Sequence, residues 1–244
     1  MNAPLWALET AAAFWRAAGR PPSYPRDLRR SIAWGLPLTL VALPRPRVAD
    51  VFDWLEGQAI SCRIPAPDRP LRACLIASRG EGVIVIDGSD REDEQRFSMA
   101  HETAHFLRHY LEPRRRAVER LGSSILRVLD GDRPPTSDER LLSVLAHAPI
   151  GTQVHMMERD RDGEPTTPEV RRAEQEADRL AFELLAPIES VNRAIAAFST
   201  SDRLDGATAI LQDVYGLPAV QAAQYASLLA PPLPDSQTRR WGFA

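Results

Sequence analysis

A strand–turn–strand–helix segment at residues 71–111 constrains the fold most strongly. The runs LRACLIAS and GVIVIDGS flank the short connector RGEG, so residues 71–88 are predicted to form a β-hairpin. The residues that follow carry apolar side chains at helical spacing: Phe97, Ala100, Ala104, Leu107 and Leu111. A helix with one apolar stripe must bury that stripe against another layer. We therefore expect this helix to pack against the hairpin.

The remainder of the chain is predicted to be mainly helical. Capping residues, apolar spacing and prolines indicate helices at about 4–19, 27–34, 48–58, 113–129, 136–147, 167–187, 188–199 and 203–230. One further strand is expected, in the run TQVHMMERD at 152–160. The predicted fold class is α+β, with a mainly helical core and a small antiparallel β-sheet.

Composition excludes several classes of protein. The net charge of −3 gives no reason to expect nucleic acid or an anionic membrane as a partner. The N-terminal run MNAPLWALETAAAFWRAAGR contains Glu9 and Arg16, which favours an amphipathic helix over a signal peptide. No stretch approaches the ~18 continuous apolar residues of a membrane span. A cytoplasmic protein is the expectation.

The helix after the hairpin contains the motif H-E-x-x-H, formed by His101, Glu102 and His105. Two histidines four residues apart project from one helical face and can bind one Zn²⁺ through their imidazoles. The glutamate between them can serve as general base without being a ligand. The alternative is a structural helix that happens to be rich in histidine. The histidines flank the apolar stripe, which favours the metal site.

The third ligand is expected on a second helix. A metzincin site would need glycine at 108 and histidine at 111, where this chain has Arg108 and Leu111. The other common arrangement uses a glutamate from another helix and leaves the fourth position to water. The segment EQEADRLAFELLAP at 174–187 offers such a carboxylate.

Helical register selects Glu174 as that ligand. At about 100° per residue, Glu174 and Asp178 lie on the same side of the apolar stripe, and Glu176 lies on the opposite side. Asp178 can then accept the free N–H of a ligand histidine and fix its tautomer. The alternative has Glu174 paired with an arginine at the surface and Glu176 reaching the metal through a bent helix.

Two further histidines have candidate roles. His109 continues the series but turns away around the helix, so an outer hydrogen bond is favoured over ligation. His155, in the 152–160 strand, is a candidate donor to the oxyanion formed during peptide hydrolysis; a histidine with no chemical role is the alternative.

The motifs together resemble the ImmA/IrrE family of bacterial metallo-endopeptidases. The resemblance rests on RFSMAHETAHFLRHY preceded by the strand VIVIDGS and followed by EQEADRLAFELLAP, with Asp178 where asparagine is common. It implies a zincin-like core and a zinc endopeptidase that cleaves or inactivates a helix-turn-helix repressor in phage, mobile-element or stress control. The competing hypothesis is a catalytically idle, zinc-bound module that regulates a repressor or toxin by binding it.

The predicted organisation has four parts. One of them contains an insertion, because the gap between His105 and Glu174 is longer than in the short form of the family. The parts are a helical region at 1–70, the peptidase core at 71–200 with an insertion at about 112–168, a helix-turn-helix-like segment at 201–230 and a Pro-rich tail at 231–244. The insertion could shape the access of substrate or bind a partner. The alternative is that it only adds to the packing of the fold. The 201–230 segment lacks the basic face that DNA requires, so we expect it to pack on the core.

Overall fold

The computed structural model describes residues 3–58, 67–141, 148–158, 167–199 and 202–229. The Pro-rich tail therefore lies outside the described residues. The strands are β1 (Leu38–Leu43), β2 (Leu71–Ser78), β3 (Glu81–Asp87) and β4 (Gln153–Glu158). The longer helices are α1 (Leu5–Ala18), α3 (Val48–Gly57), α4 (Glu92–His105), α5 (Glu112–Leu121), α8 (Pro168–Leu185), α10 (Arg203–Asp213) and α11 (Ala219–Leu229). The shorter helical segments are α2 (Arg29–Gly35), the π-helical turn η1 (Phe106–Leu111), η2 (Ser123–Ile125), α6 (Leu126–Leu129), α7 (Ser137–Leu141) and α9 (Ile188–Ala194).

The α+β class is confirmed, but the sheet is mixed rather than wholly antiparallel. Its strand order is β1-β3-β2-β4. The predicted hairpin forms, with β2 antiparallel to both β3 and β4, whereas β1 runs parallel to β3. The sequence did not predict β1, a six-residue apolar run between Pro37 and Pro44 whose pairing partner begins at Glu81. Nothing local distinguishes such a short run from a loop, because the hydrogen bonds that define it come from a distant strand.

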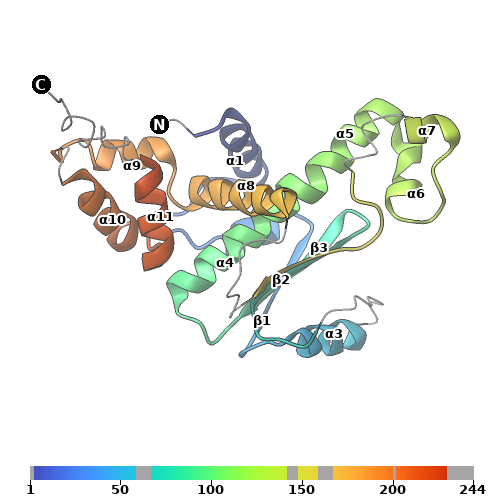
Figure 1. Cartoon of the computed structure of the whole chain (residues 1–244), viewed down its shortest axis with the longest axis horizontal. Coiled ribbons are helices and arrows are strands. Elements are labelled where there is room, and N and C mark those ends of the chain that lie inside the picture. The colour runs from blue at the N-terminus through green and yellow to red at the C-terminus, as the bar shows by residue number, and fades with distance from the viewer. Residues whose placement is uncertain (1–2, 59–66, 142–147, 159–166, 200–201, 230–244) are drawn as a thin grey trace, which may run out of the picture.

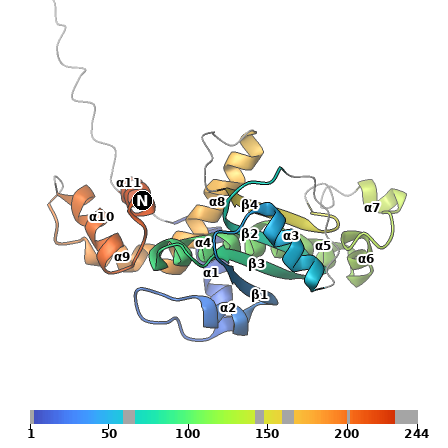
Figure 2. The ribbon, with the colours of Figure 1, turned by 90° about the horizontal axis from the view of Figure 1, so that it is seen from below.

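Helices cover both faces of the sheet (Figures 1 and 2). Along β2, Ala73, Leu75 and Ala77 belong to the main core with α4 and α8, while Cys74 and Ile76 pack with α3. This alternation follows from the pleat of a strand, in which successive side chains point to opposite faces. Because both faces are covered, the central strands read as nearly continuous apolar runs.

The C-terminal helices contribute to the same core. Leu211 of α10, and Tyr225 and Ala226 of α11, are buried together with residues of α4 and α8. The ring of Tyr225 stacks on Phe182 of α8 at a centroid distance of 4.5 Å, and its hydroxyl donates to the carbonyl of Ala186. The helix-turn-helix-like segment is therefore fixed against α8.

The segment predicted as an insertion divides into two parts. Helices α5 to α7 lie beyond one end of the sheet (Figure 1), where α5, η2 and α6 pack around a small core of Ala117, Ile125, Val128, Leu129 and Ala148. Strand β4 then returns to the edge of the sheet beside β2. Within the described residues, no helix combines the length and the apolar character that crossing a membrane would require.

Candidate metal centre

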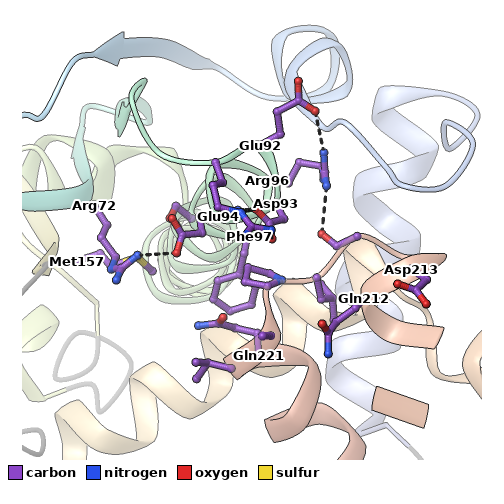
Figure 3. Close-up of a pocket in the computed structure, with 17 residues that line it drawn as sticks. Arg72, Glu92, Asp93, Glu94, Arg96, Phe97, Met157, Gln212, Asp213 and Gln221 are labelled. Atoms are coloured by element: carbon purple, nitrogen blue, oxygen red, sulfur yellow. Dashed lines mark hydrogen bonds and ion pairs between the residues drawn. The ribbon is translucent and has the colours of Figure 1, made fainter. Parts of the chain in front are cut away.

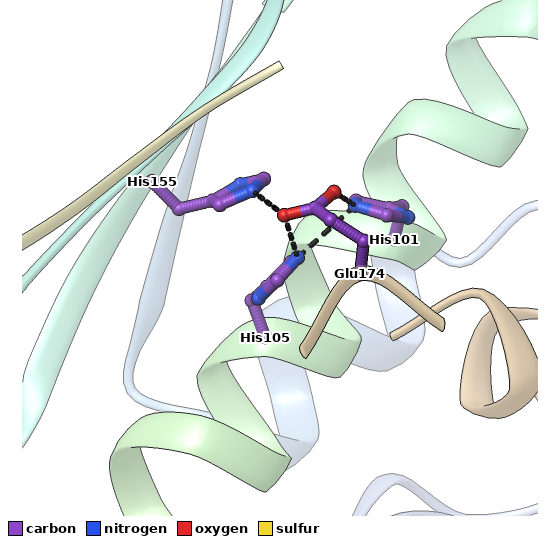
Figure 4. Close-up of side chains that lie close together, drawn as sticks. All are labelled: His101, His105, His155 and Glu174. Carbon is purple, nitrogen blue, oxygen red and sulfur yellow. Dashed lines mark hydrogen bonds and ion pairs between the residues drawn. The ribbon is translucent and has the colours of Figure 1, made fainter. Parts of the chain in front are cut away.

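Helix α4 presents the H-E-x-x-H motif in the interior of the molecule. It lies between the sheet and α8, and its apolar stripe anchors it there, with Ala100 and Ala104 fully buried. The side chains of His101 and His105 are also buried, and their Nε2 atoms lie 3.1 Å apart (Figure 4). One helical turn therefore directs two imidazole nitrogens at one point.

Helix α8 supplies the carboxylate that helical register selected. Thr167 caps the helix by accepting from the N–H of Val170, and Pro168 occupies its first turn. Glu174 Oε2 lies 3.4 Å from Nε2 of His101, and Oε1 lies 3.7 Å from Nε2 of His105. The structure thus brings together the three residues predicted to hold zinc (Figure 4).

Asp178, one turn further along α8, lies on the outer side of His101. Its Oδ1 is 2.9 Å from Nδ1 of His101, which directs the other ring nitrogen toward Glu174. The side-chain amide of Gln224, on α11, donates to the second oxygen of Asp178 at 3.0 Å. The contact of Asp178 was expected; the contact of Gln224 was not, since an exposed glutamine on a distant helix carries no signal of it.

Strand β4 adds His155 from the opposite side. Its partner in the sheet is Leu75, whose side chain faces α4, so His155 faces α4 as well. Its ring stacks on that of His105 at a centroid distance of 3.7 Å, and its Nε2 lies 2.9 Å from Oε1 of Glu174. Its Nδ1 lies 3.0 and 2.9 Å from the two oxygens of Glu102. The sequence placed His155 near the cleft, but the contact with Glu102 was missed because it depends on strand pairing.

The donor set fits a divalent metal ion of the zinc type. The four candidate ligand atoms, from His101, His105, His155 and Glu174, all lie within 4.8 Å of one another. Ligands of a tetrahedral Zn²⁺ at 2.0–2.1 Å are separated by about 3.3–3.4 Å. The separations of 3.1, 3.4 and 3.7 Å among His101, His105 and Glu174 lie around that value. Two imidazoles and one carboxylate are also the ligand types that zinc prefers.

The electrostatics of the cluster indicate a place for positive charge. Burial alone would lower the pKa of His101, but hydrogen bonds with Asp178 and Glu174 raise it to about 9. Burial likewise opposes the shift of His155, yet Glu102 and Glu174 raise its pKa to about 10. Without a metal, two imidazolium groups therefore balance the carboxylates at neutral pH.

The other two groups of the cluster shift in the complementary sense. Burial, together with the neighbouring imidazoles, lowers the pKa of His105 well below its ordinary value. Burial alone would raise the pKa of Glu174, but hydrogen bonds with His101 and His155 lower it. His105 is thus neutral and Glu174 ionised, the forms in which both can ligate a metal.

Glu176 and His109 lie outside this donor set. Glu176 accepts from Arg108 Nε at 2.8 Å and from Arg172 Nε at 3.0 Å. Nδ1 of His109 lies 3.1 Å from Nδ1 of His105, on the side of that ring away from Glu174. The alternative in which Glu176 reaches the metal therefore has no support in this geometry.

Comparison with known proteins identifies the segment that carries the motif. A peptidase family model described as the IrrE N-terminal-like domain matches residues 64–127. No significant match was found among curated proteins or among solved structures. The matched segment contains His101, Glu102 and His105 and ends before His155 and Glu174, so the family match and the geometry of α8 are independent observations. The match at 64–127 supports the resemblance to the ImmA/IrrE family that the sequence motifs predicted.

Proposed function

We propose that this chain is a zinc-dependent endopeptidase that cleaves or inactivates a protein partner. The observation that carries the proposal is the meeting of His101, His105 and Glu174 beside a separate buried carboxylate, Glu102. Three ligands with one neighbouring acid or base is the arrangement used by catalytic rather than structural zinc sites. A closed structural site would take His155 as its fourth protein ligand and would give Glu102 no role.

Each residue of the chain has a distinct task in this proposal. His101, His105 and Glu174 would hold the zinc ion, which when bound polarises a scissile carbonyl and makes a water molecule more acidic. Asp178 holds the His101 ring through Nδ1. Glu102 accepts a proton from the attacking water at its carboxylate and returns it to the leaving amine. His155 donates from Nε2 to the oxyanion that develops on the carbonyl oxygen.

A cleft beside the cluster offers room for a polypeptide. It has a volume of about 730 Å³ and lies between the start of α4, strand β4 and the turn from α10 to α11 (Figure 3). Phe97 and Met157 line the cleft. Phe97 lies one helical turn before His101, and Met157 lies two positions after His155 on β4. Ion pairs of Arg72 with Glu94 and of Arg96 with Glu92 lie at its rim. The rim thus combines both signs of charge, which suits a peptide rather than a nucleic acid.

The family resemblance supports a helix-turn-helix transcriptional repressor as the partner. Such a substrate would be cut once or a few times, in a linker or an exposed helix, because a buried zinc site accepts only an extended chain that local unfolding supplies. A DNA-binding partner of this kind implies that the protein acts in the cytoplasm, in the control of phage, mobile-element or stress-response genes.

One observation favours a second candidate, a zinc-bound module that acts only by binding. Glu102 is fully buried, and both of its carboxylate oxygens lie within hydrogen-bonding distance of His155 Nδ1. A general base held in this way cannot accept a proton until His155 changes position or gives up its bond. Partner binding would have to release Glu102, or the module would remain idle.

Incubation with a candidate helix-turn-helix repressor separates the two candidates. Zinc-loaded protein should yield discrete repressor fragments, and chelator-treated protein should yield none. The Glu102→Gln variant should bind the repressor without cutting it. A stable complex with the wild-type chain but no fragments would refute the peptidase and support the binding module.

A further inference from the structure

The two histidines of the motif differ in what holds their outer nitrogens. Nδ1 of His101 faces the carboxylate of Asp178, a frequent outer partner of zinc-bound histidine. Nδ1 of His105 faces Nδ1 of His109 at 3.1 Å. We propose that His109 is a positioning residue, which accepts the Nδ1–H of His105 and so directs the Nε2 of His105 toward Glu174. This inference rests on the proposed zinc site.

The backbone between His105 and His109 favours this contact. Residues Phe106–Leu111 form a π-helical turn directly after the α-helical part of α4. In an α-helix, four residues overshoot one full turn by about 40°. A π-turn is wider, so each residue advances by a smaller angle, and His109 is kept over His105 instead of turning away. Single π-turns are rare in proteins, and those that occur often lie at functional sites.

The proton arrangement is consistent with only one role for His109. An imidazole that ligates through Nε2 carries its proton on Nδ1, so Nδ1 of His105 must donate. Nδ1 of His109 must then be the acceptor, and its own proton lies on Nε2. That atom is 3.6 Å from Oε2 of Glu176, a distance for electrostatic attraction rather than a full hydrogen bond. Proton donor and acceptor thus alternate from His105 to His109.

Glu176 is itself fixed, which gives His109 a defined environment. Arg108 donates to the same Oε2 atom at 2.8 Å, and its guanidinium lies over the ring of Trp6 at 4.5 Å. Arg172 contacts the other oxygen of Glu176 from solvent, with a side chain that is 78 % exposed. His109 therefore lies between a zinc-ligand candidate and an anchored carboxylate, with one ring nitrogen toward each.

Substitutions of similar size can isolate the accepting atom. In His109→Asn, the side-chain oxygen stands where Nδ1 stood and can still accept from His105. In His109→Leu, the volume is similar but the acceptor is absent. Arg172→Ala is the matched control, because it removes an exposed contact of Glu176 without reaching His109. Zinc affinity is measured by competition with a chromophoric chelator, and Co²⁺ binding by its visible ligand-field absorption.

All variants should bind one metal ion per chain. His109→Leu should lower zinc affinity by about 10–100-fold, the usual effect of removing an outer partner, and should alter the Co²⁺ spectrum. His109→Asn and Arg172→Ala should stay within about threefold of wild type, at equal thermal stability of the metal-free proteins. Wild-type affinity in His109→Leu, or equal losses in His109→Leu and His109→Asn, would overturn the inference. Complete loss of the metal from both would make His109 a ligand and overturn it as well. A wild-type chain that binds no zinc would instead refute the proposed function.

Discussion

Removal of Glu174 should abolish tight zinc binding, whereas removal of Glu176 should not. Glu174 oxygens lie 3.4 and 3.7 Å from the Nε2 atoms of His101 and His105, close to the separation of tetrahedral zinc ligands. Loss of an outer partner such as Asp178 costs about 10–100-fold in affinity. Loss of a ligand must cost more than that, and so more than about 2.8 kcal/mol at 1.4 kcal/mol per tenfold.

The expected order of affinity loss is therefore Glu174→Ala, then Asp178→Ala, then Glu176→Ala. Glu176 faces Arg108 and Arg172, so its removal should cost less than about tenfold, acting only through the surroundings of the site. Metal-free proteins are prepared by dialysis against chelator and titrated with zinc in competition with a chromophoric indicator. His101→Ala serves as the reference for loss of a ligand.

Two controls keep this result interpretable. Urea unfolding of the metal-free variants shows whether the fold is intact. The double variant Glu174→Ala, His155→Ala detects replacement of the carboxylate by a histidine, because His155 Nε2 lies only 2.9 Å from Glu174 Oε1. Zinc affinity within about threefold of wild type in the double variant, with depletion in Glu176→Ala, would refute the assignment and the register behind it.

Three further changes test other parts of the site and fold. Glu102→Gln should retain zinc and lose peptidase activity by ~10² or more, since it removes the base but no ligand; metal loss equal to that of His101→Ala would contradict this role. His155→Ala should lower kcat by about 10²-fold or more at unchanged zinc stoichiometry, as expected for an oxyanion donor, whereas loss of the zinc would make His155 a ligand. Phe182→Ala should cost about 3–5 kcal/mol in urea unfolding, because this buried ring stacks on Tyr225; a loss below about 1 kcal/mol would mean that the core closes around the cavity. Fragments of the repressor should also accumulate faster than those of unfolded casein, and equal rates would argue against selectivity.

Sequence periodicity located the features whose geometry is set within one element. The face of α4 that carries His101 and His105, and the side of α8 that carries Glu174 and Asp178, follow from the angle between successive helical residues. The hairpin of β2 and β3 follows from two β-rich runs and a short turn. In each case the deciding information lies within about twenty residues of sequence.

The features that the sequence did not predict depend on tertiary contacts. Strand β1 is defined by its pairing with β3, and the bond from Gln224 to Asp178 by the docking of α11 on α8. The π-turn at Phe106–Leu111 interrupts a helix that the apolar pattern treats as uniform. Neither hydrophobic period nor capping residues record such contacts, because the same local sequence is compatible with several of them.

The long segment after the motif shows why length alone was a poor guide to its role. Residues 112–168 were predicted as one insertion, but only α5 to α7 project beyond the sheet, while β4 completes the sheet and delivers His155. The ends of the projecting part are held by η1, which is continuous with α4, and by the pairing of β4 with β2. The entropy of closing a loop grows only with the logarithm of its length, so extra residues between two fixed ends cost little. The segments α5, η2 and α6 also bury a core of their own, which offsets part of that cost. Variation in this part can therefore occur without moving His155 relative to Glu102 and Glu174.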